Sequence, residues 1–108
     1  MRIAGGVGEG VQDMAKALKI NPRDNCAVLL ADVNRGEAVE VRSETEVLRL
    51  NARCAIASGH KIALIRLAVD QPIIKYGEEI GRAKTAIEPG DWIHLHNVYC
   101  RRGHENQE

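Results

Sequence analysis

The chain has 108 residues and a mass of 11.9 kDa, which corresponds to one domain with one hydrophobic core. Hydrophobic residues make up 44% of it and charged residues 28%, the proportions of an ordinary folded globular protein. A domain of this size has little interior volume for a large catalytic cavity, so we do not expect it to form a complete enzyme by itself.

The charges are balanced, with fifteen basic and fifteen acidic residues interleaved along the chain, and they predict no basic stripe for nucleic acid. The three aromatic residues, Tyr76, Trp92 and Tyr99, are too few for a base-stacking platform. No apolar run approaches the roughly 20 residues of a membrane span, and Met1 is not followed by the apolar segment of a signal peptide. We therefore expect a cytoplasmic protein that binds neither nucleic acid nor membrane.

The predicted elements are short strands. Residues 1–12 are rich in glycine and predict a flexible tail, residues 13–100 predict the domain, and residues 101–108 predict a polar C-terminal tail. The spacing near residue 17 fits a helix or a strand, and we favour a strand from about Ala17. Further strands are predicted over residues 26–31, 38–41, 47–50, 62–69, 73–76 and 92–99. Since the connections are too short for crossover helices, the sequence predicts a mostly β domain of short, mainly antiparallel strands.

A weak internal repeat supports this interpretation. Residues 33–39 and 87–93 share an aliphatic residue, two turn residues, a glycine, an acid, any residue and a second aliphatic residue. Gly36 and Gly90 are expected to take a positive φ in these turns. A third, degraded copy over residues 67–73 has Asp70 at the glycine position, and aspartate tolerates that conformation better than most residues.

The three cysteines, Cys26, Cys54 and Cys100, are odd in number and lack C-x-x-C spacing. This pattern is typical of reduced thiols rather than a disulfide framework. Two of the three lie in apolar stretches, and we predict buried, inert thiols.

Reactive side chains gather in three segments, residues 59–61, 75–77 and 94–97. On a strand, His94 and His96 would share one face and Leu95 the other. That face either holds part of a metal shell or a carboxylate, or is a solvated strand face without function. The pair His60 and Lys61 either grips an anion or is an ordinary exposed pair after a glycine turn.

The other segments carry the same ambiguity. Lys75 and Tyr76 are either ligand-binding or an ordinary strand end, with the aromatic ring half-buried and the lysine in water. Asp24 and Asn25 are predicted to form a turn or cap through local bonds to the backbone.

Four segments, in order and spacing, carry a resemblance to a known family. PRDNCAVLLADVNRGEAVEV, GHKIAL, IIKYGEEIGRA and IEPGDWIHLHNV, all within residues 22–98, resemble the small SAF domain of the altronate and galactarate dehydratase family. The resemblance implies a SAF-type β-clip fold. It also implies a separate small subunit, as in altronate dehydratase-like enzymes and (2R)-sulfolactate sulfo-lyase, completed by a large lyase subunit. Assembly as a homo-oligomer is a further alternative.

The implied reaction is removal of a proton next to a carboxylate and expulsion of water or sulfite from a sugar acid or related hydroxy acid. The resemblance implies a divalent metal, iron, manganese or magnesium, held mainly by the large subunit. It places His60 and Lys61 near the substrate anion with Lys75 beside them, as binding and catalytic residues, and Tyr76 as a binding residue.

The last segment is implied to form the face shared with the large subunit. His94 and His96 are its metal-ligand candidates, and Asn97 is a catalytic candidate. One departure stands out, because many family members have a histidine where this chain has Asn21. The alternative function is therefore a SAF module that binds a sugar acid or a protein partner without chemistry.

Overall fold

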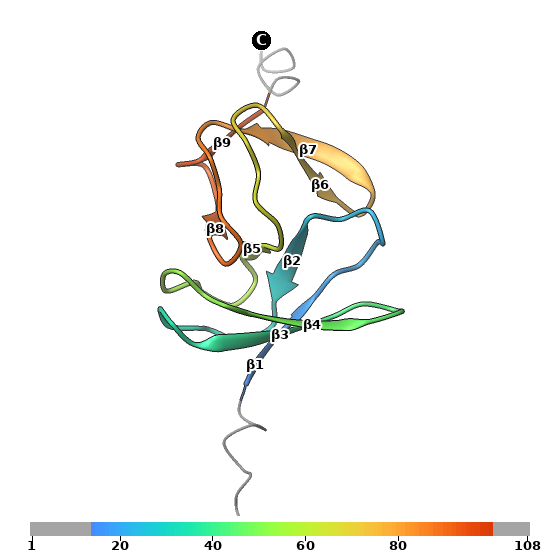
Figure 1. The fold of residues 1–108 in the computed structure, drawn as a ribbon, viewed down its shortest axis with the longest axis vertical. Helices are drawn as coiled ribbons and strands as arrows, with labels where there is room; N and C mark the ends of the chain where they lie inside the picture. The colour runs from blue at the N-terminus through green and yellow to red at the C-terminus, as the bar shows by residue number, and fades with distance from the viewer. Residues whose placement is uncertain (1–13, 101–108) are drawn as a thin grey trace, which may run out of the picture.

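The structure, a computed structural model, describes residues 14–100, and this part of the chain contains nine strands and no helix. Six strands form one sheet in the order β4-β3-β1-β2-β5-β8, and three form a smaller sheet in the order β6-β7-β9 (Figure 1). All neighbouring strands are antiparallel except β1 and β3. The predicted mostly β, mainly antiparallel fold is confirmed. The strands are β1 (Ala15–Leu18), β2 (Cys26–Leu29), β3 (Ala38–Arg42), β4 (Val47–Asn51), β5 (Lys61–Ala63), β6 (Pro72–Lys75), β7 (Glu78–Ala83), β8 (Trp92–Ile93) and β9 (Val98–Tyr99).

The tails predicted over residues 1–12 and 101–108 lie outside the described residues. Within residues 14–100, no helix is present that could cross a membrane.

Two clusters of aliphatic side chains form the core, and strands β2 and β5 lie between them. In β5, Ile62 belongs to one cluster and Ala63 to the other, because successive side chains of a strand point to opposite faces. Ala27 and Cys26 divide in the same way in β2. The largest fully buried side chains of the two clusters are Leu29, Val39, Val41, Ile62, Leu67, Ile73, Ile87 and Ile93.

Four turns share one geometry. Gly36, Gly59, Asp70 and Gly90 all have positive φ, between 72° and 93°. The predictions for Gly36, Gly90 and the aspartate at position 70 are confirmed. The Gly59 turn is a fourth copy, because residues 56–62 repeat the aliphatic residue, the two turn residues, the glycine and the final aliphatic residue.

The four turns associate in two pairs. An isolated antiparallel bridge joins Val33 to Ile56, at the starts of the first two turns, and another joins Leu67 to Ile87, at the starts of the last two. The domain thus contains two pairs of turns that are joined in the same way, and each aliphatic residue of the bridges is buried.

Several strand boundaries differ from the prediction. The strand predicted over residues 62–69 ends at Ala63, and the one predicted over 92–99 is interrupted by a turn over residues 94–97. Strand β7 was not predicted, because glutamates and a glycine are poor strand formers. Its Gly81 is required by close packing, since a Cβ there would lie 2.7 Å from Cγ1 of Val98.

Candidate functional site

Three imidazoles gather round Trp92, the single tryptophan of the chain. The His94 ring is stacked on the indole, with centroids 4.8 Å apart and planes 18° apart. His96 lies 5.1 Å from the indole, and His60 meets it edge-on at 5.5 Å. His60 and His94 are themselves 5.3 Å apart. We call these four residues the imidazole–indole cluster, and all of them are at least partly exposed.

The register of strands β5 and β8 brings the cluster together. Lys61 pairs with Ile93 and Ile62 pairs with Trp92, so the next pair in the same register is His60 and His94. Two segments more than thirty residues apart in sequence therefore present their imidazoles side by side.

The strand predicted for His94, Leu95 and His96 is wrong, because residues 94–97 form a turn. Leu95, which was expected on the strand face opposite the two histidines, lies in this turn and is 75% exposed. The two imidazoles still share a neighbourhood, through their common contact with Trp92 rather than through strand alternation.

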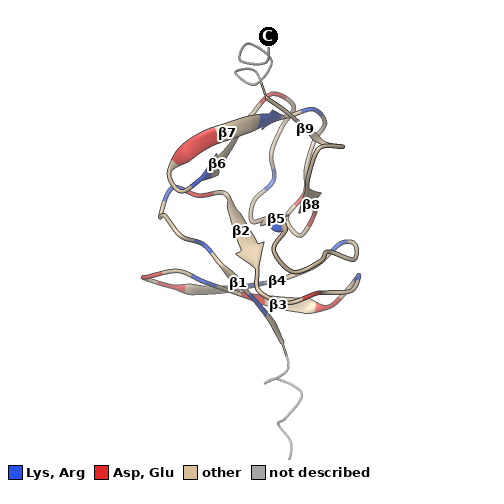
Figure 2. Cartoon of the chain, turned by 180° about the vertical axis from the view of Figure 1, so that it is seen from behind, with Lys and Arg blue, Asp and Glu red and all other residues tan. Residues whose placement is uncertain are grey.

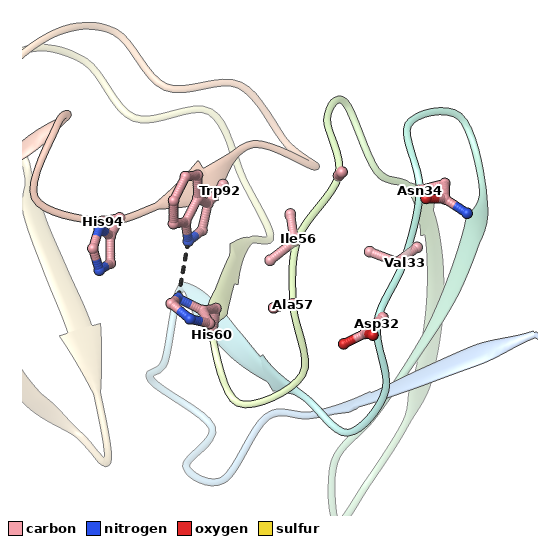
Figure 3. A pocket seen from close by; sticks show the side chains of 9 residues that line it. Asp32, Val33, Asn34, Ile56, Ala57, His60, Trp92 and His94 are labelled. Carbon is pink, nitrogen blue, oxygen red and sulfur yellow. Dashed lines mark hydrogen bonds between the residues drawn. The ribbon is translucent and has the colours of Figure 1, made fainter.

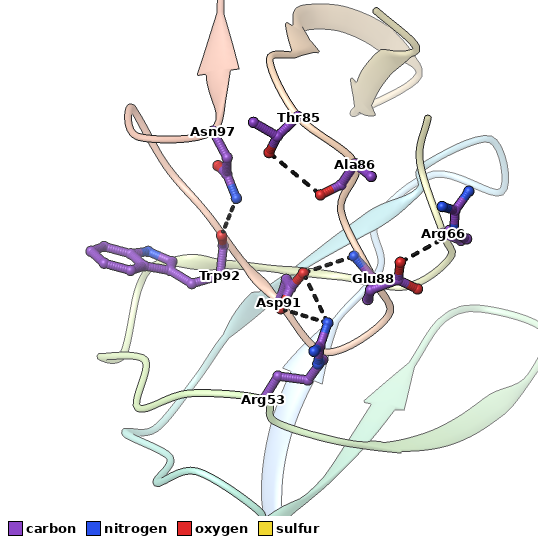
Figure 4. A network of polar contacts seen from close by, with 8 residues as sticks. All are labelled: Arg53, Arg66, Thr85, Ala86, Glu88, Asp91, Trp92 and Asn97. Carbon is purple, nitrogen blue, oxygen red and sulfur yellow. Dashed lines mark hydrogen bonds and ion pairs between the residues drawn. The ribbon is translucent and has the colours of Figure 1, made fainter. Parts of the chain in front are cut away.

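Asn97 holds this turn in place. Its Oδ1 accepts a hydrogen bond from the backbone N–H of His94 at 2.9 Å. Its Nδ2 donates to the carbonyl of Trp92 at 2.8 Å, the bond that Figure 4 shows. The residue is 7% exposed. The predicted catalytic candidate therefore has its side-chain amide engaged with the backbone of the cluster.

Three members of the cluster, His60, Trp92 and His94, form one wall of an open depression of about 540 Å³. In Figure 3, this wall faces the segment of Asp32, Val33 and Asn34, and Ile56 and Ala57 lie between the two. Oδ1 of Asp32 accepts a hydrogen bond from the Ser58 N–H at 2.8 Å, which fixes the far wall. This depression is the candidate binding site.

His60 differs from its counterparts in the other three turns. Glu37, Gln71 and Asp91 occupy the same position, and the side chain of each accepts a hydrogen bond from a backbone N–H of its own turn, at 2.7 to 2.9 Å. His60 makes no such bond among the described residues, and its ring instead accepts from Nε1 of Trp92 at 3.2 Å. In the described part of the chain, the turn that carries His60 therefore lacks the side-chain to backbone hydrogen bond that caps the other three turns.

The predicted lysines do not line this depression. Lys61 is next to His60 in sequence, but neighbouring residues of a strand point to opposite sides. It lines a second, mostly apolar depression of about 340 Å³ beside Leu95, and His94 borders both. The structure therefore brings His60, His94 and His96 together and leaves Lys61 on the adjacent side.

Lys75 and Tyr76 lie at the β6–β7 hairpin. Tyr76 and Gly77 both have positive φ, which is the geometry of a two-residue type I′ turn. The Lys75 ammonium lies 4.7 Å from the centre of the Tyr76 ring, and that ring is 56% exposed. Neither residue lines the depression of the imidazole–indole cluster.

The segment around Asp24 supports this hairpin. Asp24 is 5% exposed and its carboxylate accepts from the N–H of Gly77 at 2.8 Å and from that of Asn21 at 3.1 Å. Asn25 exchanges side-chain and backbone bonds with β6, including a 2.8 Å bond from the Ile74 N–H. The predicted local cap is therefore correct for Asp24 with Asn21, whereas the other bonds are long-range.

Position 21 lies beside the β6–β7 hairpin. The Asn21 side chain fills the space beside Gly77, where a Cβ would lie 2.9 Å from its Nδ2. The departure from the family pattern is thus located at the hairpin turn.

The cysteines are free thiols in three environments. Burial is the main cause that raises the pKa of Cys26 to about 11, with the charge of Asp24 adding to it and those of Lys61 and Lys75 opposing it. Cys54 is half-buried, and Cys100 is exposed, so the prediction of buried thiols is correct for Cys26 and wrong for Cys100.

The residues described here do not form a metal site of their own. Within residues 14–100, no group of three or more histidine, cysteine or acidic side chains is placed to hold a metal ion. Structural and catalytic metal sites usually take at least three protein ligands. His94 and His96 are therefore, at most, a partial ligand set, and this part of the chain does not fit a complete metal centre.

Charge is dispersed rather than concentrated at the depression. Figure 2 shows acidic and basic residues interspersed over both sheets. Several form exposed pairs, such as Arg53 with Asp91 and Arg66 with Glu88. Such exposed pairs contribute little to stability. Among the residues that line the depression, the titratable side chains are those of His60, His94 and Asp32.

Trp92 lies in the candidate site, although its sequence context did not predict it there. The available signal was the fourth turn copy, where a histidine replaces the acid or amide of the other three. That replacement distinguishes His60 from its counterparts, and the indole of Trp92 is the hydrogen-bond partner of its ring.

Comparison with known proteins gives consistent matches. Residues 15–101 match the family model of the altronate/galactarate dehydratase SAF domain. The chain is 42% identical over 81 residues to the altronate dehydratase of Escherichia coli strain K12. This match covers 75% of this chain but only 16% of the dehydratase. It is 35% identical over 77 residues to the (2R)-sulfolactate sulfo-lyase subunit alpha of Chromohalobacter salexigens, covering 69% of this chain and 82% of that subunit. With the same subunit of Paracoccus pantotrophus the identity is 39% over 62 residues, covering 57% and 92%. The chain thus spans a small part of the dehydratase and most of each alpha subunit.

Proposed function

Because the chain belongs to the altronate/galactarate dehydratase SAF domain family, we propose that it is the small subunit of a lyase for a sugar acid or related hydroxy acid. A separate large subunit completes the enzyme. The observation that carries the proposal is the coverage of relatives, since the proteins that this chain matches over most of their length are named alpha subunits of a sulfo-lyase.

The chemistry is a β-elimination. A base removes the proton from the carbon next to the carboxylate, the bond from the adjacent carbon to oxygen or sulfur breaks, and water or sulfite leaves. The resulting enol becomes a keto acid. This chain contributes the imidazole–indole cluster and its open depression, where imidazoles can donate hydrogen bonds to the substrate or exchange protons near neutral pH.

In this proposal, the large subunit supplies most of the ligands of any divalent metal, because the described residues offer no more than an incomplete set. His94 and His96 are proposed to add an imidazole from this side. His96 is exposed and His94 half-buried, so both rings can be reached by a partner that covers the 94–97 turn.

The test is reconstitution. The chain, a candidate large subunit and their mixture are each assayed with altronate, galactarate and (2R)-sulfolactate, and the keto acid and sulfite are measured. We expect turnover by the mixture alone. Turnover by the purified chain without a partner would contradict the proposal, and binding of a sugar acid without turnover in any mixture would favour the non-catalytic binding module.

A double variant tests the role of the turn. Changing both His94 and His96 to alanine should abolish activity of the mixture while the thermal midpoint stays within a few degrees, because substitutions of partly exposed polar residues cost little stability. The control is Arg49→Ala, an exposed position on β4 that lines neither depression. A large loss of stability in the double variant would instead assign the histidines a structural role.

A further inference from the structure

We propose that Trp92 is a positioning residue for His60. Its indole N–H holds the imidazole in the tautomer that carries its proton on Nε2, and His60 then donates a hydrogen bond to an oxyanion of the ligand. The inference rests on the proposed function, because the oxyanion is the carboxylate of the hydroxy acid.

The hydrogen bond fixes the tautomer. Nε1 of Trp92 and Nδ1 of His60 are 3.2 Å apart. The indole nitrogen is only a donor, so Nδ1 must accept, and a neutral imidazole that accepts at Nδ1 carries its proton on Nε2. A doubly protonated ring would place a donor against a donor at this contact. A neutral ring that keeps this contact therefore has its N–H at Nε2, on the side of the ring away from the bonded Nδ1.

The indole is itself held from two sides. Trp92 packs against the first core cluster, and its carbonyl accepts the bond from Asn97. The His94 ring is stacked on the indole with an 18° angle between the planes. The donor that orients His60 is thus fixed before any ligand arrives, which is the condition for preorganised binding.

The backbone of His60 is fixed as well. Its N–H donates to the carbonyl of Ala57 at 3.1 Å, and its carbonyl accepts from Leu29 at 2.9 Å. The side chain makes no cap to its own turn among the described residues. Among the described residues, the hydrogen bond and the ring contacts of the His60 imidazole are made with Trp92 and His94, which belong to the cluster.

The tautomer assigns a role to His60. Because Nε2 already holds a proton, the ring donates to the ligand and does not act there as the base that removes the substrate proton. The base is then His94, His96 or a group of the large subunit.

The side chains that line the depression determine the orientation of the bound ligand. Asp32 lies on the wall opposite His60 (Figure 3). A substrate carboxylate is repelled by that side chain and attracted by the Nε2–H, whereas substrate hydroxyl groups can donate to it. The ligand class is therefore a hydroxy acid with its carboxylate at His60 and its hydroxyl groups towards Asp32.

The tautomer is measured by nitrogen-15 NMR of the imidazole rings, on the full chain without any partner. We expect the neutral His60 ring to show a protonated Nε2 and an unprotonated Nδ1. In Trp92→Phe, which keeps an aromatic ring but has no donor, we expect this single pattern to be lost to a mixture. The control is Tyr99→Phe, which removes an aromatic donor bonded to Asp70 and should leave the pattern unchanged.

Titration with galactarate tests the ligand. We expect the His60 ring resonances to move in the wild-type chain and in Tyr99→Phe, with the dissociation constant about five-fold higher in Trp92→Phe, the equivalent of one neutral hydrogen bond. A wild-type His60 protonated on Nδ1, or ring resonances that galactarate leaves unmoved, would overturn the inference without recourse to any variant. Reconstituted lyase activity with a Nδ1-protonated His60 would leave the proposed function standing and remove this inference alone.

Discussion

Replacing Asn97 with alanine tests whether this buried amide organises the 94–97 turn. The substitution removes the 2.9 Å bond from the His94 N–H and the 2.8 Å bond to the Trp92 carbonyl. The alanine can replace neither bond, so two backbone groups next to the imidazole–indole cluster lose their side-chain partner.

The magnitude follows from burial. Each hydrogen bond contributes about 1 kcal/mol, and a buried backbone group left unpaired costs about 1–3 kcal/mol, so the free energy of unfolding should fall by about 3 kcal/mol. A domain of this size loses about 4–8 °C per kcal/mol, which corresponds to a midpoint roughly 12–24 °C lower. The matched control is Asn51→Ala, where an exposed amide gives up one 2.9 Å bond to the Gly36 carbonyl. Its cost should stay below about 1 kcal/mol.

The assay is urea unfolding followed by the fluorescence of Trp92, the single tryptophan. Both variants and the wild type are compared at the same pH, with the slope of the transition checked for two-state behaviour. Equal losses in Asn97→Ala and Asn51→Ala would refute the assignment of Asn97 as the residue that holds the turn, and would return it to the catalytic candidates.

Two further predictions concern turns and thiols. The Gly90→Ala variant should unfold at a much lower urea concentration than the Gly36→Ala variant. Both glycines have positive φ, but a Cβ at position 90 would lie 2.2 Å from a backbone oxygen, whereas a Cβ at position 36 would have no atom within 4 Å. Similar urea midpoints for the two variants would contradict this prediction. The raised pKa of Cys26 means that only the unfolded chain loses this proton between about pH 9 and 11, so stability should fall as pH rises through that range. Unfolding measured against pH should show this decline less strongly in Cys26→Ala, and thiol labelling of the native chain should modify Cys100 before Cys26.

The fold could be predicted where the chain must adopt conformations that few residues tolerate. Gly36, Gly90 and Asp70 were identifiable because a positive φ restricts the choice of residue. Strand β7 was missed because its stability comes from pairing with β6 and β9, not from the β propensity of its own residues. Tertiary pairing of this kind leaves little trace in a local pattern.

The sequence predicted which histidines belong to the candidate site but not the backbone geometry that brings them together. His60, His94 and His96 do lie together, but a period-two argument could not reveal that residues 94–97 turn. The lysines were grouped with His60 because they are near it in sequence or in the family's pattern. Strand alternation separates Lys61 from it, and hairpin geometry places Lys75 beside Tyr76.

The repeated turn offers a way to separate stability from function at one position. Aspartate at position 91 caps its own turn by accepting from the Glu88 N–H at 2.7 Å, and the corresponding N–H of Ala57 has no such partner among the described residues. His60→Asp should therefore restore the missing cap and raise the free energy of unfolding by about 0.5–1 kcal/mol, while the imidazole that Trp92 orients is lost.

We expect this variant to be more resistant to urea than the wild type and to lose galactarate binding. A histidine retained only for packing would give the opposite result, with lower stability on substitution and no effect on the ligand. Natural sequences depart from a locally stabilising pattern chiefly where function requires it. A more stable, non-binding His60→Asp chain would identify the uncapped turn as such a departure, because the residue that would stabilise the turn best cannot donate a hydrogen bond to a carboxylate.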